Sequence, residues 1–149
     1  MNLLVINGPN LNLLGLREPD IYGKQTFADL IAMINDVCES EGISVTTYQS
    51  NHEGAIVDTI QDAYRKYDGI VINPGAYTHY SIAILDALKA VSIPTIEVHL
   101  SDIHSREEFR NVSITGNAAL KIIYGLGFEG YKRAIIEMKE YLEGKNING

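Results

Sequence analysis

The sequence predicts an α/β protein with a flavodoxin-like, doubly wound parallel β-sheet that is flanked by helices. Apolar runs of strand length alternate with amphipathic runs of helix length, which is the pattern of a parallel sheet with helical crossovers. The strand runs are apolar throughout, as expected for strands covered on both faces. With 149 residues and 46% hydrophobic content, the chain is long enough for one core and too short to suggest two. We therefore expect a single domain over residues 1–149.

The N-terminal half supplies two strand and helix units. Residues 3–8, LLVING, form a continuous apolar run that ends in turn residues, and they predict the first strand. Residues 26–42 predict the first helix, because their apolar side chains recur at helical spacing and Gly42 ends the pattern. Residues 45–50 predict the second strand, and residues 54–67 predict the second helix.

The C-terminal half continues the alternation. Residues 69–76 and 94–101 predict the third and fourth strands, with a helix between them at 81–91. A polar loop and a stretch of helical character follow. Residues 125–130, GLGFEG, match the GxGxxG spacing of dinucleotide sites, but only about twenty residues come after them, too few for the βαβ unit of roughly 30 residues that such a site needs. We expect a turn there, before the final helix.

Composition and charge exclude several classes of partner. The net charge of −7 and the lack of Lys and Arg patches argue against nucleic acid and anionic membranes. No basic leader precedes a long apolar segment, and no apolar run approaches the ~18 residues of a membrane span, so we expect a cytoplasmic protein. The single cysteine, Cys38, lies among apolar residues and predicts a buried thiol in a reducing compartment. The four histidines lack metal-ligand spacing, and we expect no metal site.

Polar residues follow each predicted strand at its carboxyl end, where open α/β sheets bind their ligands. These residues are Asn7, Asn10, Asn51, His52, Asn73, Gly75, Glu97, His99 and Ser101. A phospho-acceptor domain would need an acidic cluster after the first strand and an Asp at the end of the third, whereas this chain has Asn at both places. A P-loop and a GxSxG nucleophile elbow are also absent from the sequence, which excludes those activities.

Glu97 and His99 stand two residues apart on one predicted strand, so their side chains point to the same face. A carboxylate beside an imidazole fixes the tautomer of the ring and raises its pKa, which suits a general acid. The alternative is a hydrogen-bonded pair that merely satisfies two buried polar groups. The two residues alone leave both interpretations open.

Residues 10–25 connect the first strand to the first helix, and this connection is longer than the usual range of about 2–6 residues. Its leucines are too apolar for a solvated loop and its glycines offer hinges, so the segment is typical of an active-site lid. Arg17 and Tyr22 lie within it. A nearby cation favours the phenolate form of a tyrosine, and Tyr22 is the better base because arginine cannot lose its own proton. A structural loop with an incidental tyrosine is the alternative.

Three blocks of the sequence carry a resemblance to a known family. Residues 6–23 (INGPNLNLLGLREPDIYG), 72–88 (INPGAYTHYSIAILDAL) and 96–110 (IEVHLSDIHSREEFR) resemble, in register, the defining blocks of type II 3-dehydroquinate dehydratase, a small enzyme of the shikimate pathway. The resemblance implies a hydro-lyase that removes water from 3-dehydroquinate by anti elimination, through an enolate, to give 3-dehydroshikimate. It also implies that the reaction uses no Schiff base, metal or other cofactor.

The resemblance implies a chemical role for each matching residue. Tyr22 would remove the proton beside the ketone, and Arg17 would activate it. Asn10 would hold a water against the enolate oxygen, and His99, oriented by Glu97, would protonate the departing hydroxyl. Such an elimination needs a base, an oxyanion stabiliser and an acid, and these residues supply all of them.

Further residues are implied in substrate binding and assembly. The ring hydroxyls and carboxylate of the substrate would be held by Asn73, Gly75, His79, Leu100, Ser101 and Arg110. The family forms trimers whose active sites border a neighbour, and four trimers make a dodecamer. By the same resemblance, Asp86 would come from the neighbouring subunit. We therefore expect a homo-oligomer whose small-molecule partner is 3-dehydroquinate.

The segment SREEFR predicts how an anionic substrate is bound by an acidic chain. Ser105 and Glu108 have capping-box spacing and predict a helical turn that places Arg106 and Arg110 on one face. One such arginine can bind a carboxylate through two parallel hydrogen bonds. Asp102 stands where the family usually has Asn, and it puts a negative charge near this site.

Two other classes of function would fit the fold. A flavodoxin-like module that binds FMN should carry a Ser/Thr-rich phosphate loop after the first strand, which this sequence lacks. A non-catalytic assembly protein would keep the helices and lose the polar residues at the strand ends, and these residues are intact.

Overall fold

Five parallel strands form one sheet in the computed structural model, which describes residues 1–16, 20 and 24–144. The strands are β1 (Asn2–Asn7), β2 (Ser44–Gln49), β3 (Gly69–Asn73), β4 (Thr95–His99) and β5 (Lys121–Tyr124). Their order across the sheet is β2-β1-β3-β4-β5, which is the order of flavodoxin-like doubly wound sheets. The predicted fold class is confirmed.

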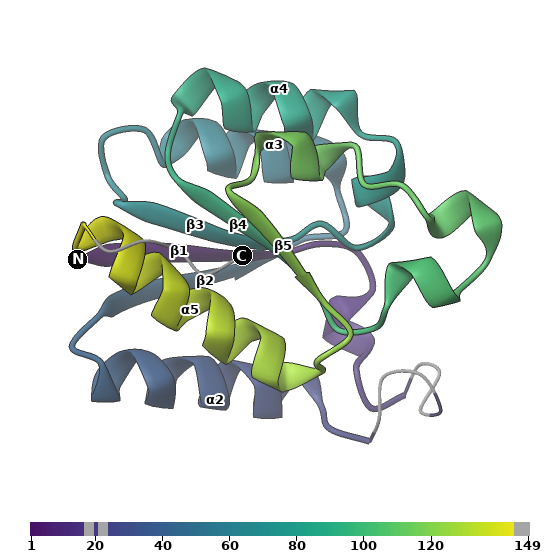
Figure 1. The fold of residues 1–149 in the computed structure, drawn as a ribbon, viewed down its shortest axis with the longest axis horizontal. Helices are drawn as coiled ribbons and strands as arrows, with labels where there is room; N and C mark the ends of the chain where they lie inside the picture. The colour runs from purple at the N-terminus through teal and green to yellow at the C-terminus, as the bar shows by residue number, and fades with distance from the viewer. Residues whose placement is uncertain (17–19, 21–23, 145–149) are drawn as a thin grey trace.

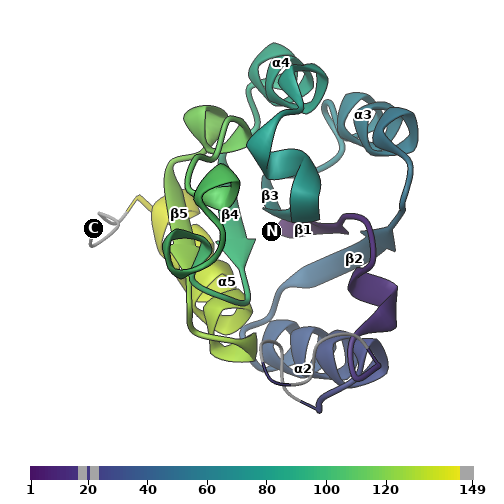
Figure 2. The same ribbon diagram turned by 90° about the vertical axis from the view of Figure 1, so that its right-hand side faces the viewer.

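Helices cover both faces of the sheet, with α2 and α5 on one side and α3 and α4 on the other (Figure 1, Figure 2). These helices are α2 (Phe27–Ser40), α3 (Glu53–Asp62), α4 (Ile82–Val91) and α5 (Phe128–Leu142). Short 3-10 helices lie in the connections, namely η1 (Leu11–Leu13), η2 (Gly75–His79), η3 (Ile103–Ser105), η4 (Glu108–Arg110) and η5 (Thr115–Ala118). None of the helices in the described residues is long and apolar enough to cross a membrane.

Alternate residues of each strand pack into separate cores on the two faces of the sheet. In β1, Leu3 and Val5 pack on the side of α2 and α5, whereas Leu4 and Ile6 pack on the side of α3 and α4. This period of two is what a strand covered on both faces requires. The same alternation places Asn7, the last residue of β1, on the side of α5.

Most predicted elements are confirmed to within a few residues, but the C-terminal region needs a correction. The sequence indicates helical character after the polar loop, and this is wrong for Lys121–Tyr124, which forms β5. This strand is only four residues long and is paired in parallel with β4. So short an apolar run fits a helix or a strand equally well, and pairing with β4 decides between them.

Two turns define the limits of α3 and α5. Helix α3 ends at Asp62 rather than at residue 67, and Arg65 has a φ of 63° in the turn that follows. The turn predicted within GLGFEG is confirmed, because Gly125 and Gly127 have φ values of 78° and 58° and α5 begins directly after them. Both glycines adopt a backbone conformation that residues with a Cβ rarely take.

The carboxyl ends of β1 and β3 lie in close contact. The N–H of Gly8 donates to the carbonyl oxygen of Asn73 at 2.8 Å. A Cβ on Gly8 would lie 2.4 Å from the carbonyl oxygen of Pro74, so only glycine fits at this position. In this strand order, β1 and β3 border the topological switch point, where doubly wound sheets bind their ligands.

Cys38 lies on α2 and is 1% exposed, which confirms the predicted buried thiol. Burial raises the pKa of Cys38 to about 11. The thiol therefore stays protonated at neutral pH and is a poor nucleophile.

Candidate active site

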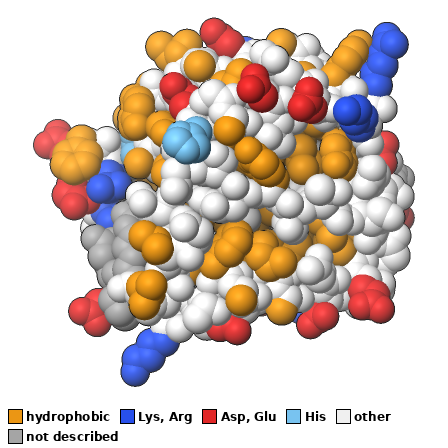
Figure 3. All heavy atoms as spheres, turned by 180° about the vertical axis from the view of Figure 1, so that it is seen from behind, with side chains coloured by type: hydrophobic (Ala, Val, Ile, Leu, Met, Phe, Trp, Pro, Cys, Tyr) orange, Lys and Arg blue, Asp and Glu red, His pale blue; other side chains and the backbone are white. Residues whose placement is uncertain are grey.

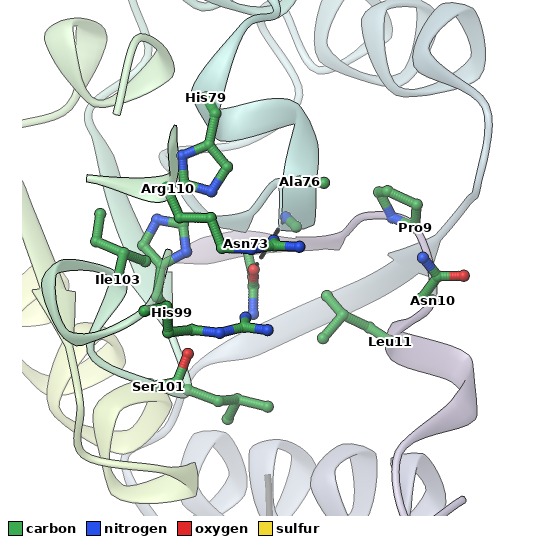
Figure 4. A pocket seen from close by; sticks show the side chains of 13 residues that line it. Pro9, Asn10, Leu11, Asn73, Ala76, His79, His99, Ser101, Ile103 and Arg110 are labelled. Carbon is green, nitrogen blue, oxygen red and sulfur yellow. Dashed lines mark hydrogen bonds between the residues drawn. The ribbon is translucent and has the colours of Figure 1, made fainter. Parts of the chain in front are cut away.

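A pocket opens at the carboxyl edge of the sheet, beside the ends of β1, β3 and β4 (Figure 4). The residues expected from the sequence that line it are Asn10, Asn73, Gly75, His79, His99, Leu100, Ser101 and Arg110. Arg106, which the segment SREEFR also indicates, lines the pocket too, and the remaining lining residues are Pro9, Leu11, Ala76 and Ile103. The space between the lining atoms, with the open mouth included, is about 510 Å³.

Glu97 and His99 lie side by side on β4, as their spacing predicts. The His99 Nε2 and Glu97 Oε2 atoms are 2.9 Å apart, and the two residues are 5% and 0% exposed. A carboxylate only accepts hydrogen bonds, so His99 Nε2 carries the hydrogen in this contact. The other ring nitrogen, Nδ1, is then the one available to a ligand in the pocket.

Hydroxyl groups surround the Glu97 carboxylate. Ser113 Oγ donates to Oε2 at 2.5 Å, Thr78 Oγ1 donates to Oε2 at 3.0 Å, and Thr115 Oγ1 donates to Oε1. Burial by itself raises the pKa of the Glu97 carboxyl, but the hydrogen bond and charge of His99 and these hydroxyl hydrogen bonds outweigh it, so the pKa lies below its usual value. Glu97 is therefore ionised at neutral pH and holds His99 by a charge-assisted hydrogen bond.

Asn73 and Gly75 are fixed to each other at the end of β3. Asn73 is 3% exposed, and its Oδ1 accepts a hydrogen bond from the N–H of Gly75 at 3.1 Å (Figure 4). Gly75 has a φ of 61°, and a Cβ there would lie 3.1 Å from the carbonyl oxygen of Pro9. Glycine at this position lets the N–H turn back onto Asn73 while the segment after β1 packs close by.

His79 is oriented by a backbone contact. Its Nδ1 lies 2.8 Å from the carbonyl oxygen of Val112, and because a carbonyl only accepts, Nδ1 carries the hydrogen. Burial lowers the pKa of His79, and the Val112 hydrogen bond offsets this only in part. The neutral ring therefore offers Nε2 as a hydrogen-bond acceptor to the pocket that it lines.

Leu100 and Ser101 follow β4 and are held by the glycine turn after β5. The N–H of Gly127 donates to the Leu100 carbonyl at 3.0 Å, and the N–H of Gly125 donates to the Ser101 carbonyl at 3.1 Å. The turn at the GxGxxG spacing thus has a structural role. It fixes the backbone that presents Ser101 to the pocket.

The capping box predicted between Ser105 and Glu108 is wrong. Ser105 ends η3, and its hydroxyl donates to the carbonyl oxygen of Asp102 at 2.9 Å. Glu108 begins the separate helix η4, which has no side-chain cap. The Ser105 hydroxyl bonds back to the preceding turn, and the chain forms the two short 3-10 helices η3 and η4 in place of one helical turn.

Arg106 and Arg110 both line the pocket despite this break. Arg110 Nε donates to Glu107 Oε2 at 2.7 Å, which orients the guanidinium. The carboxylate of Asp102 caps η3, because its Oδ1 accepts from the N–H of His104 at 2.9 Å. The pocket of this acidic chain therefore carries positive charge on two lining side chains.

Asn10 sits at the rim of the pocket in a left-handed backbone conformation, with a φ of 68°. Its N–H donates to Asn51 Oδ1 at 3.0 Å, and the Tyr77 hydroxyl donates to the carbonyl of Asn51 at 2.8 Å. Asn51, which the sequence places at the end of the second strand, thus supports the turn that carries Asn10.

The sequence model of the family described as "Dehydroquinase class II" matches residues 1–139. The chain belongs to this family. The 3-dehydroquinate dehydratase of Clostridium acetobutylicum is 56% identical over 142 residues, which cover 95% of this chain and 99% of that protein. The 3-dehydroquinate dehydratase of Carboxydothermus hydrogenoformans is 48% identical over 149 residues, which cover 100% of this chain and 97% of that protein.

Solved structures of class II dehydroquinases share the fold of this chain. The crystal structure of the type II dehydroquinase from Butyrivibrio crossotus has a TM-score of 0.92 at 57% identity, with 93% of this chain and 97% of that chain covered. The type II dehydroquinase from Propionibacterium acnes has a TM-score of 0.87 at 40% identity, with 95% of this chain and 96% of that chain covered. The family resemblance that the three sequence blocks carry is confirmed.

Three residues implied by the class II dehydroquinase resemblance are not placed in the pocket. Arg17 and Tyr22, the expected activator and base, lie outside the described residues, as does part of the predicted lid at 10–25. Asp86 is exposed on α4 and is not a lining residue of this chain's own pocket. Its expected place is the pocket of a neighbouring subunit.

The hydroxyl residues around Glu97 are functional candidates that sequence reasoning missed. Thr78 comes from η2, whereas Ser113 and Thr115 come from the segment at the start of η5. In the sequence, the only trace of these partners is the stretch SIT at residues 113–115. Hydroxyl side chains are too common in loops for such a stretch to predict contact with a carboxylate. Among the described residues, no three His, Cys, Asp or Glu side chains are grouped as metal ligands.

Proposed function

We propose that this pocket removes water from 3-dehydroquinate by anti elimination through an enolate intermediate. Membership of the class II dehydroquinase family assigns to the chain the activity of a 3-dehydroquinate dehydratase, a hydro-lyase of the shikimate pathway. The observation that carries the mechanism is the buried, ionised Glu97 bound to His99 at the wall of the pocket. Residues 1–149 act as a single catalytic domain in this proposal.

His99 is the proposed acid that protonates the departing hydroxyl. Its Nε2 hydrogen is held by Glu97 at 2.9 Å, which leaves Nδ1 to meet the substrate. A protonated ring carries hydrogen on both nitrogens, and the adjacent carboxylate stabilises this cation in a site where bulk water does not. When Nδ1 gives its proton to the leaving hydroxyl, the ring becomes neutral and remains hydrogen-bonded to Glu97.

Tyr22 is the proposed base, and Arg17 is the cation that activates it. The titratable residues that line the described pocket are His79, His99 and two arginines. The arginines cannot accept a proton, His99 is assigned to the acid step, and the lowered pKa of His79 makes it a weak base. None of these lining residues suits the role of the base, which supports a base from the predicted lid at residues 10–25.

The substrate is proposed to lie between the acid and the arginines. Arg110 and the Ser101 region bind its carboxylate and ring hydroxyls, together with Asn73, Gly75, His79 and the backbone of Leu100. A net charge of −7 repels an anionic substrate, so local arginines are needed to bind it. Asn10 is proposed to hold a water against the developing enolate oxygen, since a preorganised donor stabilises charge that forms during the reaction.

The active form is proposed to be a homo-oligomer, a dodecamer built from four trimers, in which Asp86 approaches the pocket of the next subunit. Asp86 is exposed on α4, and Ile82 on the same helix and Tyr80 just before it are each 60% exposed. Figure 3 shows further hydrophobic side chains gathered across the face opposite to that of Figure 1. A closed oligomer would cover such apolar surface.

The proposed setting is the cytoplasm, without a nucleic-acid or membrane partner and without a cofactor. Support comes from the net charge of −7, which disfavours binding to polyanions, and from a free cysteine that is buried.

A direct assay tests the proposed function. Purified protein is mixed with 3-dehydroquinate, and the ultraviolet absorbance of the conjugated enone product is followed with time, with and without a chelator. We expect turnover at neutral pH that the chelator leaves unchanged and that His99→Ala abolishes. No absorbance change in the presence of stoichiometric protein would refute the activity, and turnover that EDTA removes and a divalent ion restores would refute the metal-free mechanism.

A further inference from the structure

Behind the pocket, a fully buried tyrosine lies between two asparagines. Tyr131, on α5, is 0% exposed, and its hydroxyl donates to Asn7 Oδ1 at 2.6 Å and accepts from Asn73 Nδ2 at 2.9 Å. Asn7 and Asn73 are the last residues of β1 and β3 and are paired in register. The C-terminal helix thus contacts the carboxyl edge of the sheet at its switch point.

The direction of these hydrogen bonds is set by the backbone at Gly75. Its N–H can only donate, so the Asn73 atom that faces it at 3.1 Å is Oδ1, and Nδ2 must face Tyr131. The phenol oxygen accepts from Nδ2, and its single proton then goes to Asn7 Oδ1. The series of hydrogen bonds therefore runs one way, from the Gly75 backbone to Asn7.

The Tyr131 hydroxyl is not needed to fill the core. The ring belongs to an apolar cluster with Ala134, Ile135 and Met138, where phenylalanine would occupy nearly the same volume. Burying a hydroxyl and two amides is unfavourable unless they bond to one another. Even so, the buried Asn7 Nδ2 has no hydrogen-bond partner among the described residues. Burial also raises the pKa of Tyr131 far above its usual value, so the phenol keeps the proton that it donates.

We propose that Tyr131 is a positioning residue for the reaction: its hydroxyl holds the Asn73 amide in one orientation against the substrate. Without this hydroxyl, Asn73 Nδ2 loses its acceptor. The side chain, still bonded through Oδ1 to the Gly75 N–H, then moves more readily away from the geometry in which it lines the pocket. The inference rests on the proposed function, because Asn73 is one of the residues proposed to hold 3-dehydroquinate.

A double-mutant cycle separates positioning from simple packing. The variants are Tyr131→Phe, Asn73→Ala and the combination, with Tyr64→Phe at a 53% exposed tyrosine as the matched control. We expect Tyr131→Phe to lower kcat/KM about tenfold, mainly through KM, which is the effect of losing one buried hydrogen bond to a binding group. In the Asn73→Ala background the same change should alter kcat/KM less than about twofold, because no amide remains to be positioned. The control should match the unaltered protein.

Equal losses in the two backgrounds, or an unaltered kcat/KM in Tyr131→Phe, would overturn the inference. Inactivity of the unaltered protein toward 3-dehydroquinate would instead refute the proposed function. The orientation of Asn73 can be measured without activity, from hydrogen exchange of its side-chain amide signals in NMR spectra, assigned by their loss in Asn73→Ala. Exchange should accelerate at least about tenfold in Tyr131→Phe, and unchanged exchange would also overturn the inference.

A second variant covers the case in which Tyr131→Phe does not fold. Asn7→Ala keeps the tyrosine ring and removes the acceptor of its proton, so the phenol is free to turn from Asn73. We expect a smaller loss of kcat/KM, about threefold, that again disappears in the Asn73→Ala background. A loss that persists there would overturn the inference in the same way.

Discussion

Glu97→Gln removes the charge beside His99 while the side chain keeps nearly the same volume. Through Oε2 the carboxylate accepts from His99 Nε2, Ser113 and Thr78, and through Oε1 it accepts from Thr115. A glutamine amide should turn its oxygen toward His99, because the Thr115 hydroxyl can accept from the amide NH₂ as well as donate. The main loss is then the negative charge that stabilises a cationic imidazole.

The size of this loss follows from the burial of the pair. Breaking a buried ion pair costs about 3–5 kcal/mol, and a hydrogen bond to a charged group is worth about 1.5–3 kcal/mol. Because the glutamine keeps the hydrogen bond and loses the charge, we expect a loss of about 3–4 kcal/mol in the transition state, or roughly 100- to 1,000-fold in kcat. Glu97 lies behind His99 and is not a lining residue, so KM should change little.

The assay is the initial rate of enone formation over a range of 3-dehydroquinate concentrations, with circular dichroism and thermal unfolding as checks of the fold. Glu53→Gln is the matched control, because Glu53 also accepts a hydroxyl hydrogen bond, from Ser81 at 2.6 Å, but does not line the pocket. This control should keep the wild-type kcat. If Glu97→Gln folds and its kcat stays within about threefold of wild type, the charge of Glu97 does not support the acid step.

Four further outcomes are expected. Tyr22→Phe should remove at least ~4 kcal/mol of transition-state stabilisation, measured as kcat/KM, and near-wild-type turnover would rule out Tyr22 as the base. Thr115→Val removes one donor to Glu97 and should lower kcat about three- to tenfold; an unchanged kcat would show that the hydroxyl is dispensable. Asp86→Ala should raise KM and weaken the trimer in light scattering, whereas a fully active monomer would contradict the proposed assembly. Finally, the pKa of Glu97 is lowered in the folded chain, so its carboxylate stabilises the fold above the usual value of 4.5 and this contribution disappears as the pH falls through the folded pKa. The difference in unfolding free energy between wild type and Glu97→Gln should therefore shrink on acidification, and a constant difference would argue against a lowered pKa.

The residues that could be predicted are those whose placement depends on strand periodicity. Glu97 and His99 share a face because side chains on a strand alternate, and a spacing of two is visible in the sequence. Asn73 and Ser101 were found because ligands gather at the carboxyl ends of parallel strands. The same rule identified Asn10, although its left-handed backbone has no marker in the sequence.

The residues that could not be predicted depend on tertiary contacts between distant segments. Thr115 meets Glu97 across 18 positions, and Tyr131 meets Asn7 across 124. On its helix, Tyr131 has the spacing of an ordinary core residue, so the sequence does not reveal the polar contact at its end. Strand β5 was missed for a related reason, since its four residues are defined by pairing with β4.

The central claim is that this pocket dehydrates 3-dehydroquinate by anti elimination. It is tested most directly by finding out which hydrogen atom the substrate loses. The substrate is prepared with deuterium beside the ketone, in the position anti to the departing hydroxyl, and the product is examined by proton NMR. Anti elimination predicts 3-dehydroshikimate that has lost the deuterium. Product that retains the deuterium would contradict the anti geometry, and the absence of 3-dehydroshikimate would contradict the dehydratase assignment itself.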